Sequence, residues 1–223
     1  LSDALMQNIS AVNIAKIDLL VDEIVIDPKS RYSVIDQLAT LDLTNEQLSI
    51  ISTGLLKALS KSHMNGFIFN TNPKLPNWAS IGYNVRVLKV NNYDFSFFNP
   101  YEHSYIVNIN KISVNTLSFT LKGVRHVTTY IIEIESTIVI PRNTIYYENE
   151  LLDENTPGVI IIDSDLDTTY HLLIEEGYDG TVYYINRIVT DVDNESSKYK
   201  LYEEQHDSKP NIYDEFIVDK EAI

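Results

Sequence analysis

The sequence predicts an α+β fold: N-terminal helices, then a mainly antiparallel β domain (sandwich or barrel-like), then an irregular acidic C-terminal tail. Apolar residues recur once per helical turn up to Gly66 and at every second position after it. Negative charge gathers at the far end, where residues 143–223 hold five Lys/Arg against twenty Asp/Glu. We therefore expect a helical region at 1–66, a β-rich domain at 67–190 that can divide into 67–142 and 143–190, and an extended tail at 191–223.

The first part of the helical region is predicted from its N-terminal residues. Ser2 suits an N-cap, and apolar residues from Leu5 to Val21 give one broad helical face. Pro28 ends this helix, and the residues just before it, 24–26, can already be extended. A short helix is expected to follow at 33–41.

The next helix is the clearest prediction. Thr44 and Gln47 have the spacing of a capping box, and apolar residues then recur at helical spacing from Leu48 to Leu59. Asn65 and Gly66 supply a left-handed stop.

After Gly66, short apolar runs alternate with turn residues, and no helical pattern separates them. This order favours a sandwich, barrel or meander over a parallel sheet with crossover helices. The Gly-Tyr-Asp-Gly sequence at 177–180 is a plausible hairpin loop. We expect strands at 67–69, 81–87, 105–109, 117–121, 127–134, 138–140, 159–162, 169–174, 181–189 and 216–218.

Composition excludes several classes of chemistry. Hydrophobic residues make up 44% and charged residues 22% of the chain, as in an ordinary folded domain, and Cys is absent. Disulfides and thiolate sites are therefore impossible. No apolar run approaches the roughly 20 residues that span a bilayer, so we expect no membrane span. The acidic last third would repel phosphate backbones, so we expect no nucleic-acid partner.

One acidic cluster has a spacing that can bind calcium. Asp163, Asp165 and Asp167 alternate as D-x-D-x-D, and calcium takes six to eight oxygen ligands. Thr168 stands where an EF-hand needs Gly, and Ile174 where it needs Glu. We therefore favour a solvated acidic turn, with a calcium site as the alternative. The same alternation recurs at residues 191, 193 and 195, with the same two interpretations.

Catalytic motifs are missing from the sequence. There is no G-x-G, G-K-[ST] or G-x-S-x-G, and no two histidines have metal-ligand spacing. We expect no enzyme, no catalytic or cofactor-binding residue and no cofactor. The histidines, which we expect on the surface or in strands, are His63, His103, His126, His171 and His206.

Six aromatic residues cluster between positions 93 and 105. Buried, they would form core; exposed, they could stack on sugar rings or anchor a protein interface. We favour the core. The residues are Tyr93, Phe95, Phe97, Phe98, Tyr101 and Tyr105.

A nine-residue segment, 136–144, ends a predicted strand with a Pro-x-x-Thr turn. It resembles a segment of phage baseplate wedge proteins, with Asn143 where that family has Gly before Thr. The resemblance implies no residue roles.

The absent motifs, the uneven charge and the Cys-free composition together favour a non-enzymatic structural or assembly protein of a large complex. The most concrete form is a virion component of a phage tail, baseplate or neck, located in the virion. Its partners would be other protein subunits of the same assembly, with homo-oligomerisation expected. The alternative is an extracellular carbohydrate-binding or adhesin module, with calcium as an optional ligand.

Overall fold

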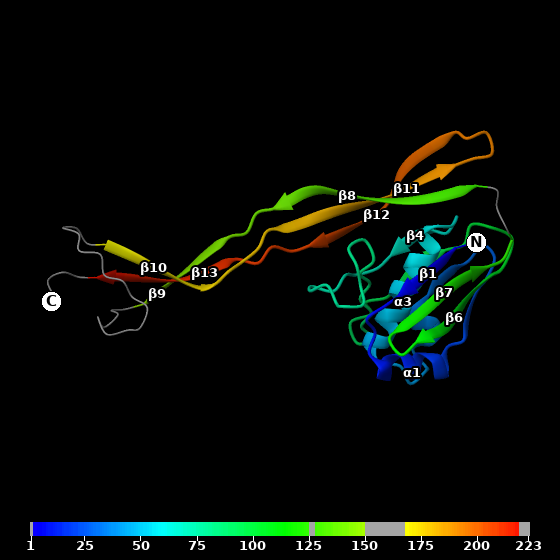
Figure 1. Ribbon diagram of the computed structural model, residues 1–223, viewed down its shortest axis with the longest axis horizontal. Coiled ribbons are helices and arrows are strands. Elements are labelled where there is room, and N and C mark those ends of the chain that lie inside the picture. The colour runs from blue at the N-terminus through cyan, green and yellow to red at the C-terminus, as the bar shows by residue number, and fades with distance from the viewer. Residues whose placement is uncertain (1, 125–127, 150–167, 219–223) are drawn as a thin grey trace. The chain divides into compact units, whose positions relative to one another are not determined.

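The computed structural model describes residues 2–124, 128–149 and 168–218 (Figure 1). Contacts divide the chain into two units. Unit 1 holds residues 1–137 and 182–205, and unit 2 holds residues 138–181 and 206–223. Strands β8, β11 and β12 continue from one unit into the other. This division does not follow the expected boundaries after residues 66 and 190.

The described chain is β-rich and its strand pairs are mostly antiparallel, which confirms the coarse prediction. The helices are α1 (Ala11–Leu20), α2 (Val34–Leu38) and α3 (Asn45–Ser60). The strands are β1 (Asp3–Met6), β2 (Glu23–Ile26), β3 (Arg31–Ser33), β4 (Asn65–Ile68), β5 (Ser96–Phe98), β6 (Tyr105–Ser113), β7 (Thr116–Lys122), β8 (Thr129–Ile140), β9 (Thr144–Asn149), β10 (Thr168–Glu175), β11 (Gly180–Thr190), β12 (Ser196–His206) and β13 (Asn211–Val218).

Helix α3 forms the centre of unit 1. Its predicted capping box is present: the Gln47 amide donates to Thr44 Oγ1 at 3.2 Å, and the Thr44 amide donates to Gln47 Oε1 at 2.9 Å. Thirteen of its sixteen residues are buried. A helix buried on all sides must be surrounded by other elements. The four-stranded sheet β1-β7-β6-β2 packs on α3 through β7 and β1, as Figure 1 shows.

A glycine lets this sheet come close to the helix. A Cβ at Gly54 would lie 2.2 Å from the Phe119 ring of β7, closer than real Cβ contacts allow. Gly54 is therefore required for packing, although glycine costs a helix interior about 1 kcal/mol relative to alanine.

A second segment docks on α3 through side chains. The amides of Lys89, Val87 and Val85 donate to Asn45 Oδ1 at 3.1 Å, Ser49 Oγ at 2.9 Å and Thr53 Oγ1 at 3.2 Å. The three acceptors are four residues apart, so they lie along one face of the helix. Every second backbone N–H of the extended segment 85–89 thus bonds to a side chain of α3 instead of to a neighbouring strand. The strand expected at 81–87 forms only isolated bridges.

The sheet β12-β11-β8 is held to α3 by a buried arginine. Arg187 of β11 is 1% exposed and donates to the carbonyls of Ser60 and Met64, each at 2.8 Å, and to the Leu59 carbonyl at 3.4 Å. Two of these carbonyls belong to the last turn of α3, where the helix dipole attracts a cation. The guanidinium also lies 6.0 Å from the Phe67 ring centroid.

A tyrosine of β12 adds to this attachment. Tyr202 donates its hydroxyl to the Gly82 carbonyl at 2.7 Å and is 8% exposed. Burial raises the pKa of the Tyr202 hydroxyl well above its ordinary value; Tyr83 and Glu204 raise this pKa further and Arg187 lowers it. Residues 185, 187 and 202 therefore complete a core whose other buried apolar members come from residues 4–121.

The predicted N-terminal helix is wrong at its start. Residues 3–6 form β1, which pairs with β7, and their burial alternates with period two, the pattern of a strand. Asn8 has a φ of 58°, which interrupts the chain before Ser10 caps α1. Helix α1 then occupies only residues 11–20, and β2 follows it.

The irregular acidic tail is also corrected. Residues 196–206 form β12 and residues 211–218 form β13. Lys198, Lys200 and Glu203 of β12 are exposed, whereas Glu204 is buried. Lys198 pairs with Glu133 at 2.9 Å and also with Glu135. Side-chain hydrogen bonds to Lys198 lower the pKa of the Glu135 carboxyl. The mixed charge at this end of the sequence belongs to paired strands and not to an irregular segment.

Candidate interaction surface

Unit 2 contains a tight crossing of three chain segments around two glycines. Gly177 donates its amide to Asn211 Oδ1 at 2.8 Å, and its carbonyl accepts from Arg142 Nη1, also at 2.8 Å. Tyr178 and Lys209 exchange two backbone hydrogen bonds, at 3.0 and 2.8 Å. A Cβ at Gly177 would lie 2.1 Å from the Lys209 carbonyl, so only glycine allows the segments to approach this closely.

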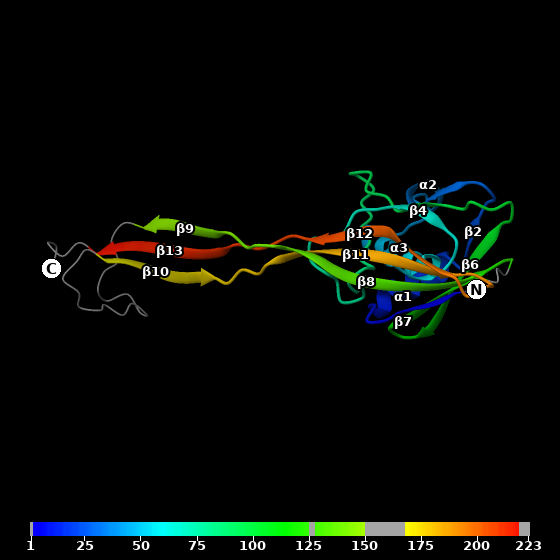
Figure 2. The ribbon, with the colours of Figure 1, turned by 90° about the horizontal axis from the view of Figure 1, so that it is seen from above.

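A three-stranded sheet in the order β10-β13-β9 makes up the rest of the described part of unit 2 (Figure 2). The central strand β13 runs antiparallel to β10 and parallel to β9. The register aligns Leu173, Tyr213 and Tyr146 in one row across the three strands. Residues aligned in this way share a face of the sheet. We call these three residues the Tyr146 row.

The Tyr146 row is apolar along its length. The rings of Tyr146 and Tyr213 are stacked, with centroids 5.6 Å apart and an interplanar angle of 28°. Leu173 is 46% exposed and Tyr146 is 48% exposed. Two residues further along the same strands, the register places Glu148, Glu215 and His171, which bound the row.

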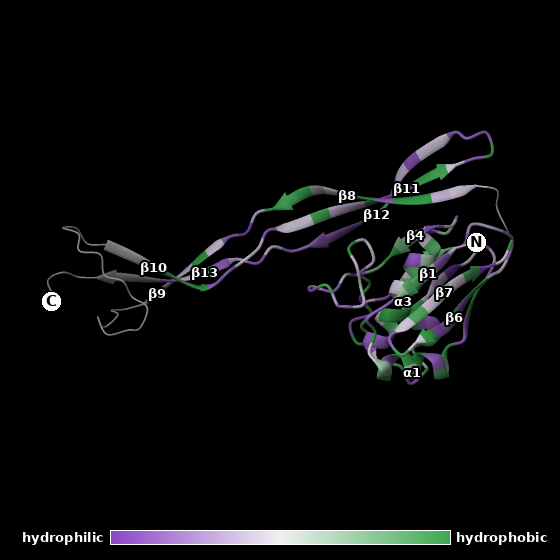
Figure 3. Ribbon diagram, viewed as in Figure 1, coloured by the Kyte–Doolittle hydropathy of each residue, from purple (hydrophilic) through white to green (hydrophobic). Residues whose placement is uncertain are grey.

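Among residues 138–147, 172–181 and 206–214 of unit 2, no apolar side chain is buried, and the only buried residues are Gly177 and Gly180. The exposed apolar residues include both faces of the sheet and the apolar end of β8, the green arrowhead in Figure 3. Unit 1, by contrast, has an extensive core. The exposed large apolar side chains of unit 2 are Ile138, Val139, Ile145, Tyr146, Tyr147, Leu172, Leu173, Ile174 and Tyr178.

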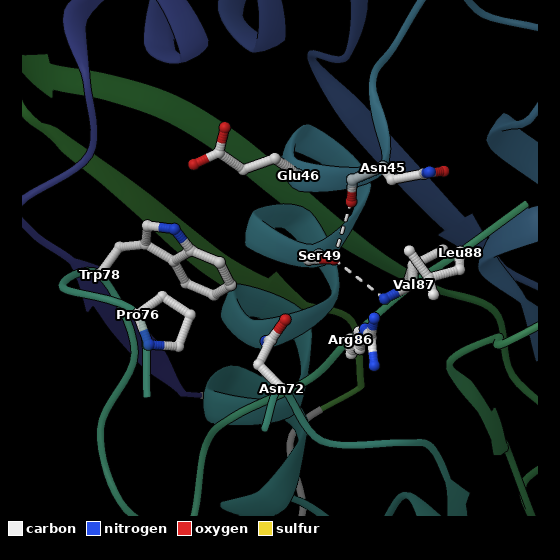
Figure 4. Close-up of a pocket in the computed structure, with 9 residues that line it drawn as sticks. All are labelled: Asn45, Glu46, Ser49, Asn72, Pro76, Trp78, Arg86, Val87 and Leu88. Carbon is white, nitrogen blue, oxygen red and sulfur yellow. Dashed lines mark hydrogen bonds between the residues drawn. The ribbon is translucent and has the colours of Figure 1, made fainter. Parts of the chain in front are cut away.

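Unit 1 has an open pocket of about 330 Å³ beside the N-terminal half of α3. Figure 4 shows Trp78 and Pro76 on one side of it, Arg86 and Leu88 on the other, and Ser49 between them. Trp78 is 8% exposed, so little of its ring is accessible for stacking.

The polar groups of this pocket already serve the fold. Ser49 Oγ donates to the Asn45 carbonyl at 2.7 Å and accepts from the Val87 amide, and Asn72 Nδ2 donates to Asn84 Oδ1 at 2.8 Å. The Arg86 guanidinium lies 5.7 Å from the Tyr93 ring centroid. The lining contains neither His nor Cys, and its one hydroxyl, that of Ser49, already makes the two hydrogen bonds given above. Its one carboxylate is that of Glu46.

No family model, curated protein or solved structure matches the chain. Within the described ranges, no group of His, Asp and Glu is arranged to hold a metal ion, and no helix is long and apolar enough to cross a membrane. The calcium candidates Asp163, Asp165 and Asp167, and also His126, lie outside the described residues, so that calcium site stays a prediction.

The second acidic cluster lies in the β11–β12 turn. Asp191 Oδ1 accepts the amides of Asp193 at 2.9 Å and Glu195 at 3.0 Å. The Asp191 carboxylate therefore stabilises a turn, which agrees with the interpretation of this cluster as a solvated acidic turn.

Half of the aromatic cluster between positions 93 and 105 is buried in the core, and Tyr93, Phe98 and Tyr101 are half-buried. Phe95, Phe97 and Tyr105 are 0% exposed, and His63 packs against the Tyr105 ring at 4.7 Å. Sequence reasoning missed both Arg187 and the Tyr146 row. Arginine is rarely fully buried, so nothing in the sequence marks Arg187 as a core residue, and the Tyr146 row requires knowing the strand register.

Proposed function

We propose that the protein is a non-enzymatic structural component of a large assembly, most concretely a virion component such as part of a phage tail, baseplate or neck. The observation that carries this proposal is the exposure of nine large apolar side chains in unit 2, with no apolar side chain buried among residues 138–147, 172–181 and 206–214. A three-stranded sheet needs a covered apolar face to be stable. Its exposed apolar residues therefore favour coverage by other subunits.

The size of this surface supports the same conclusion. Monomeric proteins rarely expose contiguous apolar patches larger than a few hundred Å², and larger ones mark interaction sites. Nine large apolar side chains of unit 2 are between 38% and 61% exposed. At roughly 200 Å² for each fully exposed side chain, they leave on the order of 900 Å² uncovered in total, divided between the two faces of the sheet, the end of β8 and the turn at Tyr178.

Unit 1 supports a scaffold role. The Ser49 hydroxyl in its pocket is already hydrogen-bonded, and its buried polar groups hold elements together, as Arg187 holds β11 to α3. The carbohydrate-binding alternative is weaker, because three of its six aromatic residues are fully buried and the other three are half-buried.

Fractionation of a gentle native extract tests the proposal. A specific antibody would locate the full-length protein on a sucrose gradient, and cross-linking through Lys209 of unit 2 would identify its neighbours. We expect sedimentation with a large particle and cross-links from Lys209 to other subunits. Protein found only at the 25.5 kDa mass of a single chain would contradict the assembly role.

A further inference from the structure

We propose that a second pocket of unit 1, also of about 330 Å³, binds a small molecule through an oxyanion, a phosphate or carboxylate group, held between Lys57 and Lys61. The pocket lies at the C-terminal end of α3 and wholly within unit 1. This inference therefore goes beyond the proposed assembly function and does not depend on it. The lining residues are Asp3, Ala4, Leu5, Lys57, Lys61 and Tyr83.

The pocket holds two lysines that have no counter-charge bound to them among the described residues. Lys57 and Lys61 are four residues apart at the end of α3, a spacing at which like charges repel each other. Asp3 is the one carboxylate of the lining, and it forms an ion pair with neither lysine. The dipole of α3 attracts cations to this end, but Arg187 already donates to the carbonyls of its last turn. A bound anion would supply the missing charge.

Lys57 is half-buried, and its ammonium uses little of its hydrogen-bonding capacity within the described structure. Its Nζ donates to the Leu5 carbonyl at 3.4 Å, a long hydrogen bond, and lies 5.7 Å from the Tyr83 ring centroid. An ammonium has three donors, so two are open to a ligand. Burial lowers the pKa of the Lys57 ammonium below its ordinary value, and the charge of Lys61 lowers this pKa further. An anion placed between the two lysines would favour the charged form again.

The other half-buried lysines of the described chain have closer partners. Lys16 bonds to a carboxylate at 2.6 Å, Lys89 donates to a backbone carbonyl at 2.8 Å, and Lys209 forms an ion pair. Burying a charge costs free energy unless the charge is paired and hydrogen-bonded. Among these described lysines, Lys57 is the one that still lacks a close partner, which points to a ligand.

The remaining lining residues narrow the class of ligand. Ala4, Leu5 and the Tyr83 ring supply the apolar part of the pocket. A volume of about 330 Å³ lies at the small end of the range for ligand sites. A molecule with one anionic group and a small apolar body suits both features. Phenyl phosphate and benzoate are two probes of this kind, and they separate a phosphate from a carboxylate.

Isothermal titration calorimetry of the full-length chain with these two probes tests the proposal. Benzyl alcohol is the uncharged control ligand, because it has the ring without the anion. Lys57→Gln and Lys61→Gln each remove one cation from the pocket. Lys74→Gln is the matched control, because Lys74 is an exposed lysine of unit 1 outside the lining. Urea denaturation followed by the fluorescence of the single tryptophan checks that each variant is folded.

We expect saturable binding of at least one anion, and the tighter of the two gives the class of the oxyanion. Lys57→Gln should weaken this binding about ten-fold or more, because a hydrogen bond to a charged group is worth about that factor. Lys61 is exposed, so solvent screens its charge and Lys61→Gln should weaken binding about three-fold. Lys74→Gln should bind like the unsubstituted chain.

Three outcomes would overturn the site: no saturable binding of either anion at millimolar concentrations, equally tight binding of benzyl alcohol, or equal effects of Lys57→Gln and Lys74→Gln. If Lys57→Gln does not fold, the comparison of Lys61→Gln with Lys74→Gln decides instead. The assembly function is judged separately, by whether the native protein sediments with a large particle, so failure of one proposal leaves the other standing.

Discussion

Replacing Arg187 tests the central claim about unit 1, that one buried cation holds the sheet β12-β11-β8 to the end of α3. Arg187→Ala leaves the carbonyls of Ser60 and Met64, both now at 2.8 Å from the guanidinium, buried without this donor. Each orphaned acceptor costs roughly 1–3 kcal/mol, and the lost side chain leaves a cavity. We expect a loss of about 4–6 kcal/mol in the free energy of unfolding, a large share of a domain's usual total.

Arg187→Lys should lose less, about 2–3 kcal/mol, because an ammonium keeps the charge but lacks the planar fork that reaches several carbonyls. Urea denaturation followed by Trp78 fluorescence measures both variants, since Trp78 is the single tryptophan and lies buried in unit 1. Arg86→Ala is the matched control. Its guanidinium is half-buried over the Tyr93 ring, a contact worth about 0.5–1 kcal/mol. Equal losses for Arg187→Ala and Arg86→Ala would refute the reasoning.

Two further predictions concern packing and ionisation in unit 1. Gly54→Ala should lower the free energy of unfolding by about 1–3 kcal/mol in the same urea assay, because the added Cβ would meet the Phe119 ring; a stabilised variant would contradict the close approach. Burial raises the pKa of both Tyr32 and Tyr202, so the unfolded chain loses these protons near pH 10 while the folded chain keeps them. The free energy of unfolding should therefore be unchanged by these tyrosines below about pH 10 and should fall above it by about 1.4 kcal/mol per pH unit for each tyrosine. Tyr202→Phe should reduce this pH dependence by the contribution of one tyrosine.

Local patterns predicted the elements of unit 1 that depend on neighbouring residues. The capping box of Thr44 and Gln47 and the turn-by-turn apolar repeat located α3 within one residue at its start. Alternation after Gly66 identified a β-rich body. These patterns succeed because caps and periodicity are set by residues a few positions apart.

The structural features that the sequence did not predict depend on contacts between residues far apart in the chain. The polar stripe of Asn45, Ser49 and Thr53 was visible in the sequence, but its partners are amides some forty residues away. Strand β1 follows only from its pairing with β7, more than a hundred residues later. The Tyr146 row depends on two strand registers at once, that of β10 with β13 and that of β13 with β9. No window of neighbouring residues carries that information.

The discontinuity of unit 1 has a consequence for how the protein is made. When a ribosome has finished Thr137, the core around α3 still lacks Arg187 and Tyr202, and the next residues all belong to unit 2. About 50 residues separate Thr137 from Arg187, on the order of 3–10 seconds at ordinary translation rates. During that interval the carbonyls at the end of α3 lack the Arg187 guanidinium as a hydrogen-bond donor. A nascent chain stalled there would therefore expose part of the unit 1 core to chaperones and proteases.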